Sequence, residues 1–110
     1  MDIFCRIIKG EIKSEIVAEA EDWLAIKDIQ PQAPVHILII PKQHLELNQV
    51  AGEQTELLGK LLLAAKQVAA QLGIAETGYR LVINQGKDGG QLVPHLHIHL
   101  LGGKTLKSSL

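Results

Sequence analysis

The sequence predicts an α+β domain built on an antiparallel sheet of about five strands, with one long and one short helix. Residues 94–101 alternate between histidine and aliphatic side chains after Pro94, residues 35–40 are rich in β-branched side chains, and residues 53–72 carry apolar side chains at helical spacing. Alternation is typical of a strand with two different faces, and the longer period is typical of a helix. The elements follow one another without a regular βαβ repeat, which favours an antiparallel sheet.

The N-terminal part of the chain predicts the short helix and two strands. Residues 2–9 have apolar side chains at helical spacing, with Asp2 as the N-cap and Gly10 as the residue that stops the helix. Residues 16–20 and 23–27 are predicted to form short strands joined by an acidic turn.

A loop and a central strand follow. Residues 28–34 form the loop, because Pro31 and Pro34 lack the N–H that a sheet needs and restrain the residue before them. The β-branched run 35–40 is the predicted central strand, and Pro41 ends it.

The long helix is predicted over roughly residues 53–72. Asn48 or Gly52 is the expected start, and Gly73 is the expected residue just after its end. Gly59 lies inside the helix, where it costs about 1 kcal/mol relative to alanine. We expect this glycine to mark a close packing contact.

The C-terminal part predicts two more strands. Residues 79–84 form the first, and a glycine-rich, polar and flexible loop over residues 85–91 connects it to the histidine strand at 95–101. The tail after Gly103 is short and polar, and we expect it to fray.

The composition limits the classes of function. At 110 residues, of which 46% are hydrophobic, the chain is expected to form one domain over residues 1–110. A formal net charge of −1 argues against a nucleic-acid or membrane-surface partner. A single cysteine excludes an internal disulfide, and neither a signal-peptide core nor a membrane-spanning run occurs. We therefore expect a soluble, cytoplasmic protein.

The histidines carry the strongest chemical signal. On a strand, His95, His97 and His99 share one face, and the aliphatic residues between them share the other. Three interpretations follow: nucleophilic catalysis by an imidazole, metal binding, or a solvated polar strand face. No packing argument requires three histidines here, so the solvated face is the weakest of the three.

Five segments together resemble the histidine-triad (HIT) family, in its Hint-like branch, and occur in the family's order. They are Asp2-Ile-Phe-Cys-Arg-Ile-Ile, Asp28-Ile-Gln-Pro-Gln-Ala-Pro-Val-His36, Pro41-Lys-Gln-His44, Asn84-Gln-Gly-Lys-Asp-Gly-Gly-Gln91 and His95-Leu-His-Ile-His-Leu-Leu101. The resemblance covers almost the whole chain. It implies a HIT-like fold and a homodimer with helices and sheets paired across a two-fold axis.

The resemblance implies hydrolysis of purine nucleoside phosphoramidates and related nucleotides through a nucleotidyl-histidine intermediate, without a cofactor. It makes His97 the nucleophile, while His95 orders the site and His99 contacts the phosphate or leaving group and assists proton transfer. A neutral imidazole suits this role near pH 7, because its free pKa is about 6.5. His36 matches the family's fourth histidine, with a hydrogen-bonded core histidine as the alternative.

The resemblance also implies a nucleotide site. Asp28 matches the ribose-binding carboxylate, and Asn84 matches a polar residue near the ribose and phosphate. The main chain around Gly90 and Gln91 is the expected source of N–H donors to the phosphate, since glycine permits close approach. Apolar residues that match the slot for the base, each with ordinary core packing as its alternative, are Ile3, Phe4, Ile7, Ile26 and Ile29.

Departures from the family pattern keep other functions open. Leu92 stands where a serine is usual, which implies altered handling of the leaving group. Ile26 and Pro94 each stand where an aromatic residue is common, and the usual C-terminal tryptophan is missing. The alternative is a purine-nucleotide binding or interaction module with weak catalysis.

A metal-dependent hydrolase is the other alternative. Cys5, His44 and His95 match zinc ligands of some relatives, but Asp2 replaces the first cysteine of that set. Carboxylates also bind zinc. We expect no metal.

Overall fold

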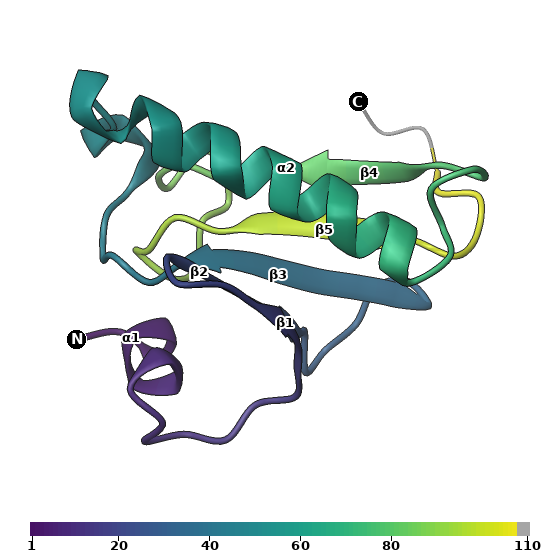
Figure 1. Cartoon of the computed structure of the whole chain (residues 1–110), viewed down its shortest axis with the longest axis horizontal. Helices are drawn as coiled ribbons and strands as arrows, with labels where there is room; N and C mark the ends of the chain where they lie inside the picture. The colour runs from purple at the N-terminus through teal and green to yellow at the C-terminus, as the bar shows by residue number, and fades with distance from the viewer. Residues whose placement is uncertain (108–110) are drawn as a thin grey trace.

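The computed structural model describes residues 1–107, and its centre is an antiparallel sheet with strand order β1-β2-β3-β5-β4 (Figure 1). The five strands are β1 (Ile16–Glu19), β2 (Trp23–Lys27), β3 (Val35–Pro41), β4 (Tyr79–Val82) and β5 (Ile98–Gly102). The two α-helices are α1 (Ile3–Ile8) and α2 (Thr55–Gln71). The predicted α+β class, with about five strands and one long and one short helix, is confirmed.

Helix α1 is capped as the sequence predicts. Oδ1 of Asp2 accepts a hydrogen bond from the main-chain N–H of Cys5 at 2.8 Å. Gly10 follows the helix with φ of +80°, a conformation that glycine adopts without steric cost. A helix of 6 residues is too short to be stable alone, so its packing through buried Phe4 holds it in place.

Helix α2 starts later than predicted, at Thr55 rather than near Asn48 or Gly52. Two short 3-10 turns precede it, η1 (Leu47–Gln49) and η2 (Gly52–Gln54). The Gln54 side chain accepts the N–H of Ala51 at 2.8 Å, so side-chain bonding closes a separate turn before the helix. No helix in the described part of the chain is long and apolar enough to cross a membrane.

The end of α2 agrees with the prediction. Gly73 has φ of +78°, and the N–H groups of Gly73 and Ile74 reach back to carbonyls of the last helical turn at 3.1 and 3.0 Å. This pair of bonds is the Schellman motif. The predicted packing contact at Gly59 is wrong, because nothing lies within 4 Å of the position that its Cβ would take.

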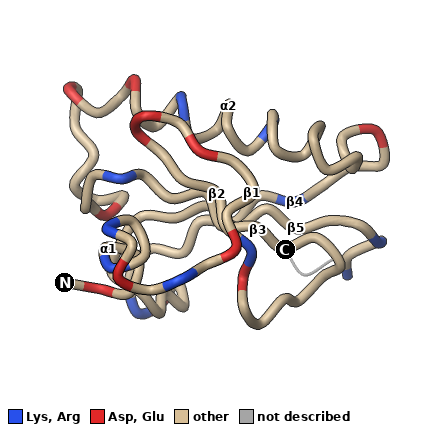
Figure 2. The backbone as a smooth tube through the Cα atoms, turned by 60° about the horizontal axis from the view of Figure 1, so that its bottom comes forward, with Lys and Arg blue, Asp and Glu red and all other residues tan. Residues whose placement is uncertain are grey.

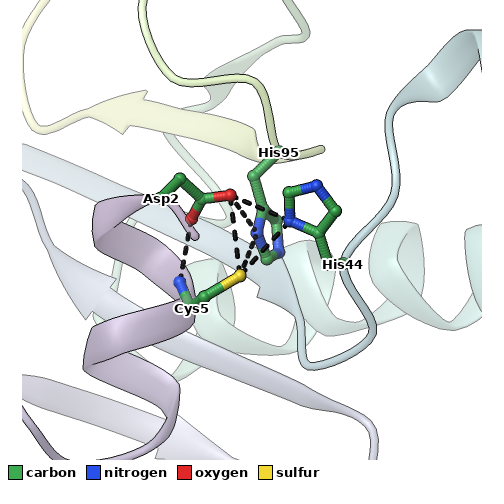
Figure 3. A group of neighbouring side chains, drawn as sticks. All are labelled: Asp2, Cys5, His44 and His95. Carbon is green, nitrogen blue, oxygen red and sulfur yellow. Dashed lines mark hydrogen bonds and ion pairs between the residues drawn. The ribbon is translucent and has the colours of Figure 1, made fainter.

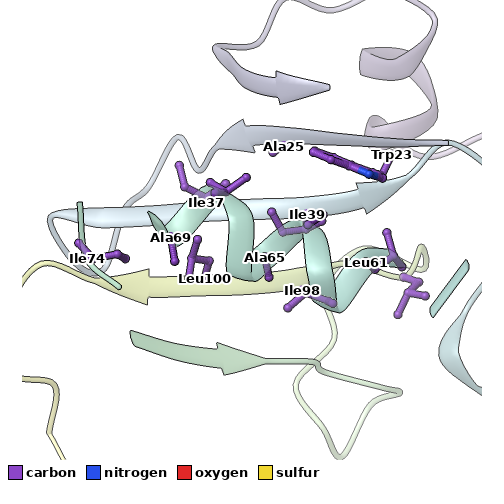
Figure 4. Packing of buried hydrophobic residues seen from close by; sticks show 13 residues of the cluster. Trp23, Ala25, Ile37, Ile39, Leu61, Ala65, Ala69, Ile74, Ile98 and Leu100 are labelled. Atoms are coloured by element: carbon purple, nitrogen blue, oxygen red, sulfur yellow. The ribbon is translucent and has the colours of Figure 1, made fainter. Parts of the chain in front are cut away.

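The sheet buries a different apolar cluster on each face. Along β3, Ile37 and Ile39 face α2, whereas Leu38 and Ile40 belong to the cluster beside α1. Figure 4 shows the larger cluster, in which α2 lies across the sheet and its small residue Ala65 lets the backbones approach. Strict alternation in the central strand therefore separates an all-apolar face from the face that carries the site.

The histidine strand is shorter than predicted. Strand β5 begins at Ile98, which pairs with Ile39, so His95 and His97 precede the strand. The ladder stops here because Pro41, two residues along β3, has no N–H to donate. The N–H of Leu96 instead donates to Leu45 at 2.7 Å. Strand β4 also stops early, at Val82 instead of residue 84.

Candidate active site

The predicted catalytic histidines lie together on the α1 face of the sheet. The ring centroids of His97 and His99 are 5.0 Å apart, and those of His36 and His99 are 5.2 Å apart. Phe4 of α1 meets the rings of His95 and His97 edge-on, with centroids 5.7 and 5.0 Å away. His36, His95 and His97 are buried, while His99 is half-buried.

Contacts around His36 determine the tautomers of His36 and His99. The main-chain N–H of Gln32 donates to Nδ1 of His36 at 3.1 Å, so neutral His36 carries its proton on Nε2. That Nε2–H faces Nδ1 of His99 at 3.0 Å and Oδ2 of Asp28 at 3.3 Å. Because Nδ1 of His99 accepts, neutral His99 carries its proton on Nε2. Burial, followed by the nearby His97 and His36, lowers the pKa of His99 to about 4.

His97 has the geometry of a nucleophile. Its Nδ1 lies 2.7 Å from the carbonyl oxygen of His95, which can only accept, so Nδ1 carries the proton. The lone pair is thereby placed on Nε2. Burial lowers the pKa of His97, although the hydrogen bond to the His95 carbonyl works in the opposite direction. The side chain is therefore a neutral imidazole near pH 7.

One nitrogen of the His95 ring faces Asp2 and Cys5 (Figure 3), and the other faces the Pro41 carbonyl. Nε2 donates to the carbonyl oxygen of Pro41 at 3.0 Å, and the residue is 0% exposed. Nδ1 faces Oδ2 of Asp2 at 3.2 Å and Sγ of Cys5 at 3.7 Å. Burial raises the pKa of Asp2, but the N–H of Cys5 and the neighbouring His95 outweigh burial, so the net pKa is lowered.

Asp28 lies beside the histidines of the candidate site. Its Oδ1 accepts the N–H of Gln30 at 2.8 Å, which fixes the carboxylate within its loop. Its Oδ2 is directed to Nε2 of His36 at 3.3 Å. The same carboxylate thus supports His36 and keeps lone pairs for hydroxyl donors.

The loop expected to be flexible is braced by its own side chains. Nδ2 of Asn84 donates to the carbonyl of Gly89 at 2.7 Å. The Gln91 side chain accepts the N–H of Gly86 at 2.7 Å and donates to the carbonyl of Val93 at 3.0 Å. Asn84 and Gln91 therefore shape the loop in this structure: the Gln91 amide is bonded through both its oxygen and its nitrogen, whereas Asn84 is bonded through Nδ2.

Main-chain donors in this loop are also partly used. The N–H groups of Gly90 and Gln91 donate to the carbonyls of Lys87 and Gly86, each at 3.0 Å. Gly90 has φ of +78°, so the backbone conformation of the turn is sufficient reason for a glycine at this position. Leu92, which follows Gln91, is 93% exposed.

The apolar residues expected to hold the base divide into two groups. Phe4 and Ile26 are buried in the cluster on the α1 face, and Ile7 packs against its edge. Ile3 and Ile29 are 44% and 87% exposed and lie outside that cluster. The structure thus brings three of the five together and leaves two at the surface.

One donor set in the described residues fits a metal ion. Asp2, Cys5, His44 and His95 offer atoms within 4.8 Å of one another. Nδ1 of His44 lies 3.2 Å from Sγ of Cys5 and 2.9 Å from Oδ2 of Asp2. Tetrahedral zinc needs about 3.3–3.6 Å between such ligands, so modest adjustment suffices. The Pro41 carbonyl also leaves Nδ1 of neutral His95 with a lone pair, as ligand histidines require.

A second group, Asp28, His36 and His99, also has donor atoms within 4.8 Å of one another. It does not fit a metal. Nδ1 of His36 already accepts from Gln32, so Nε2 would have to lose its proton to become a ligand, leaving an imidazolate.

Sequence reasoning missed the supports of the histidines. They are the Gln32 N–H, the Pro41 carbonyl and the Asp2 carboxylate, which touch His36 or His95. Two of the three are main-chain groups, which leave no mark in side-chain patterns. Asp2 was identified as the helix cap and, through the family resemblance, as the replacement for one ligand in a zinc set that includes His95, but a direct contact between the two side chains across 93 residues was not predicted.

Comparison with known proteins identifies the family of the chain. The HIT domain matches residues 9–106. The chain belongs to the HIT family. The resemblance noted from the sequence is thereby confirmed, and the histidine row corresponds to the feature for which the family is called histidine triad.

Individual relatives match along most of their length. The chain is 56% identical over 105 residues to an uncharacterised HIT-like protein of Synechococcus elongatus, covering 94% of this chain and 91% of the relative. It is 49% identical over 105 residues to the purine nucleoside phosphoramidase of Escherichia coli, covering 94% and 88%. A HIT family hydrolase from Clostridium thermocellum has a TM-score of 0.95 at 48% identity, covering 99% of this chain and 96% of that one.

Proposed function

We propose that this protein is a HIT-type nucleotide hydrolase that releases a nucleoside monophosphate from purine nucleoside phosphoramidates. The observation that carries the proposal is the 2.7 Å hydrogen bond from Nδ1 of His97 to the His95 carbonyl, which leaves the Nε2 lone pair for attack. The name of the Escherichia coli relative, 49% identical, supports the phosphorus–nitrogen bond as the target.

The reaction proceeds in two displacements at phosphorus. Nε2 of His97 attacks, a nitrogen–phosphorus bond to the enzyme forms, and the bond to the substrate's amine breaks, with a proton delivered to the departing nitrogen. Water then attacks the nucleotidyl group, loses a proton, and the bond to His97 breaks. The net reaction converts phosphoramidate and water to nucleoside monophosphate and amine.

The other polar groups act as preorganised donors. His99, neutral with its proton on Nε2, donates a hydrogen bond to a phosphate oxygen or to the leaving group. Gly90 and Gln91 use their N–H groups inside the loop, so the phosphate donors in this part of the chain come from the main chain after Gln91, at Leu92 and Val93. Asp28 accepts from the ribose hydroxyls.

The test is a trapped intermediate. Wild type is mixed with an adenosine phosphoramidate, quenched without acid, and its intact mass is compared with that of His97→Ala. We expect one adenylyl unit on the wild type, none on the variant, and release of AMP by the wild type alone. Equal AMP formation by both proteins overturns the assignment of His97.

Two alternatives rest on specific observations. The donor set around Cys5 fits zinc, which keeps a metal-dependent hydrolase as a candidate; in that case His44→Asn abolishes turnover, whereas covalent catalysis at His97 survives this change. Leu92 in place of the usual serine keeps a purine-nucleotide binding module as a candidate. That function predicts nucleotide binding that survives His97→Ala, with no turnover by either protein.

We also propose a homodimer in the cytoplasm. Helix α2 exposes Leu62 and Leu63 at 46% and 64%, and edge strand β4 exposes Tyr79 and Leu81 at 36% each. Such an apolar face beside an open strand edge favours pairing of copies. Basic and acidic positions are interspersed along the chain (Figure 2), which gives no support to a nucleic-acid partner. Light scattering should give a dimer for wild type, a monomer for Leu63→Glu and a dimer for the control Lys13→Glu, which changes an exposed lysine outside α2 and β4.

A further inference from the structure

The loop over residues 85–93 leads into the triad and carries the main-chain donors that the proposed function assigns to the phosphate. The N–H groups of Gly90 and Gln91 donate to carbonyls inside the loop, each at 3.0 Å. Those of Leu92 and Val93 have no main-chain acceptor in the described part of the chain. These two N–H groups can therefore serve an anion, provided that the main chain holds them in a fixed direction.

The side chain of Gln91 supplies part of that hold, because it joins the start of the loop to its end. Its Oε1 accepts the N–H of Gly86 at 2.7 Å, and its Nε2 donates to the carbonyl of Val93 at 3.0 Å. Since an N–H only donates and a carbonyl only accepts, the amide has one orientation. The main chain of Leu92 thus lies between two bonded groups, the N–H of Gln91 and the carbonyl of Val93.

The side chain of Gln85 fastens the same loop to the neighbouring segment 45–49. Its Oε1 accepts the N–H of Asn48 at 3.1 Å, which leaves its NH₂ group to donate elsewhere. Nε2 lies 3.5 Å from Oε1 of Gln91 and 3.5 Å from Oε1 of Glu46. In the part of the chain that the structure describes, both side-chain hydrogen bonds between the loop and segment 45–49 involve Gln85. Gln85 therefore connects the Gln91 amide to a second part of the chain.

Segment 45–49 also contacts the triad. The N–H of Leu96, the residue before His97, donates to the Leu45 carbonyl at 2.7 Å. The loop, through Gln85, and the nucleophile, through Leu96, are thus held against the same support. This common support sets the position of the phosphate donors relative to the attacking imidazole.

We propose that Gln85 is a positioning residue for the phosphate, acting through Gln91 on the main chain of Leu92 and Val93. Both ends of the Gln85 amide are bonded within the protein, so Gln85 acts on the donors rather than on the ligand. A phosphate oxygen gains most from donors that need no rearrangement on binding or in the transition state. The inference rests on the proposed function, which supplies the nucleotide phosphate.

Four variants test this role. Gln85→Met keeps the length of the side chain and removes both of its hydrogen-bonding groups. Gln91→Met and the double variant test whether Gln85 acts through Gln91. The matched control is Gln54→Met, because Gln54 is also half-buried and its amide also accepts a main-chain N–H, that of Ala51 at 2.8 Å, but in turn η2. Melting temperatures of Gln85→Met and Gln54→Met should agree within a few degrees.

The first measurement compares the dissociation constants of adenosine and AMP, whose ratio isolates the contribution of the phosphate. We expect Gln85→Met to lower this ratio about tenfold, as for a lost hydrogen bond to a charged group, with adenosine binding within about twofold of wild type. Gln54→Met should keep the wild-type ratio. An unchanged ratio in Gln85→Met overturns the proposal. Equal weakening of both ligands also overturns it, because that result indicates a general loss of structure.

The second measurement is turnover of an adenosine phosphoramidate. Gln85→Met should lower kcat about tenfold, and the double variant should match Gln91→Met, because a connection broken at Gln91 transmits nothing from Gln85. Wild-type kcat in Gln85→Met overturns the proposal. Losses that multiply in the double variant overturn the route through Gln91.

A third measurement needs neither turnover nor nucleotide. In the nitrogen-15 NMR spectrum of the free protein, the main-chain amides of Leu92 and Val93 should give single sharp signals in wild type and Gln54→Met, and broadened or split signals in Gln85→Met. Unchanged signals in Gln85→Met overturn the positioning role. If the wild type has no phosphoramidase activity, these signals still test Gln85, so failure of the proposed function and failure of this inference are distinguishable.

Discussion

Nε2 of His36 lies 3.0 Å from Nδ1 of His99, and the hydrogen in this contact belongs to His36. The assignment follows from the N–H of Gln32, which donates to the other nitrogen of His36 at 3.1 Å. His36 thereby presents a donor to His99 and directs the single N–H of neutral His99 to its far side, Nε2. A histidine in a central strand, for which simple core packing was the alternative, is thus connected to the triad by a defined hydrogen bond.

Stability should fall in acid because His99 is held neutral. Burial, with His97 and His36 nearby, lowers its pKa from 6.5 to about 4. Between these two pH values, His99 binds a proton in the unfolded chain but stays neutral in the folded protein. The contribution of neutral His99 to the free energy of unfolding is therefore complete above pH 6.5 and is lost as the pH falls toward 4. Melting temperature should decline across this window, and less steeply in His99→Gln. If the melting temperatures of the two proteins declined equally with pH, this would contradict a lowered pKa of His99.

Two glycines should respond in opposite ways to alanine. A Cβ at Gly89 would lie 2.5 Å from the carbonyl oxygen of Gln85, so Gly89→Ala must distort the loop before the triad. At Gly59 nothing lies within 4 Å of a Cβ, and alanine favours the helix by about 1 kcal/mol. Urea unfolding should show a gain for Gly59→Ala and a loss of about 1–3 kcal/mol for Gly89→Ala. A stability gain in both variants would mean that the loop tolerates the side chain.

Metal removal should leave the reaction intact. The proposed nucleophile is His97, and no step requires an ion, although Asp2, Cys5, His44 and His95 can accommodate one. Turnover after exhaustive chelation should stay within twofold of the untreated protein, and Cys5→Ser should behave alike with and without chelator. Activity that disappears on chelation and returns with Zn²⁺ would favour the metal-dependent alternative.

Leu92→Ser tests the departure from the family pattern. Because the Leu92 side chain is 93% exposed, its replacement should change the free energy of unfolding by less than about 0.5 kcal/mol. A hydroxyl here restores a hydrogen-bonding group next to the triad, and we expect kcat to rise severalfold for phosphoramidates with polar amines. The comparison should use matched polar and apolar leaving groups. Equal kcat for both proteins on every substrate would remove Leu92 from the leaving-group site.

Local patterns predicted most elements but not their ends. The β-branched run gave a central strand that the structure places at Val35–Pro41, and helical spacing gave α2 within a few residues. The histidine strand starts three residues later than predicted, because the missing N–H belongs to Pro41 on the neighbouring strand. Such a boundary depends on the partner strand, which alternation within one segment does not reveal.

In the site, too, the sequence predicted which residues are present but not all of their contacts. His97 and His99 were identified from spacing and family resemblance, and their rings lie 5.0 Å apart. Asn84, for which contact with the ligand stays a prediction, also donates to Gly89 within its own loop at 2.7 Å. A motif indicates which residue types occur, whereas the closing of a loop decides which of their polar groups are already used.

The sequence by itself determined the fold class, the two-faced alternation and the histidine row, since each depends on residues adjacent in the chain or at a fixed local period. Only the tertiary structure decided how these histidines are held. The contacts of His95 with the Pro41 carbonyl and of His36 with His99 join residues 54 and 63 positions apart. Hydrogen-bond direction at such contacts depends on which donor and which acceptor the folded chain brings within about 3 Å, and this assigns the tautomers on which the chemistry depends.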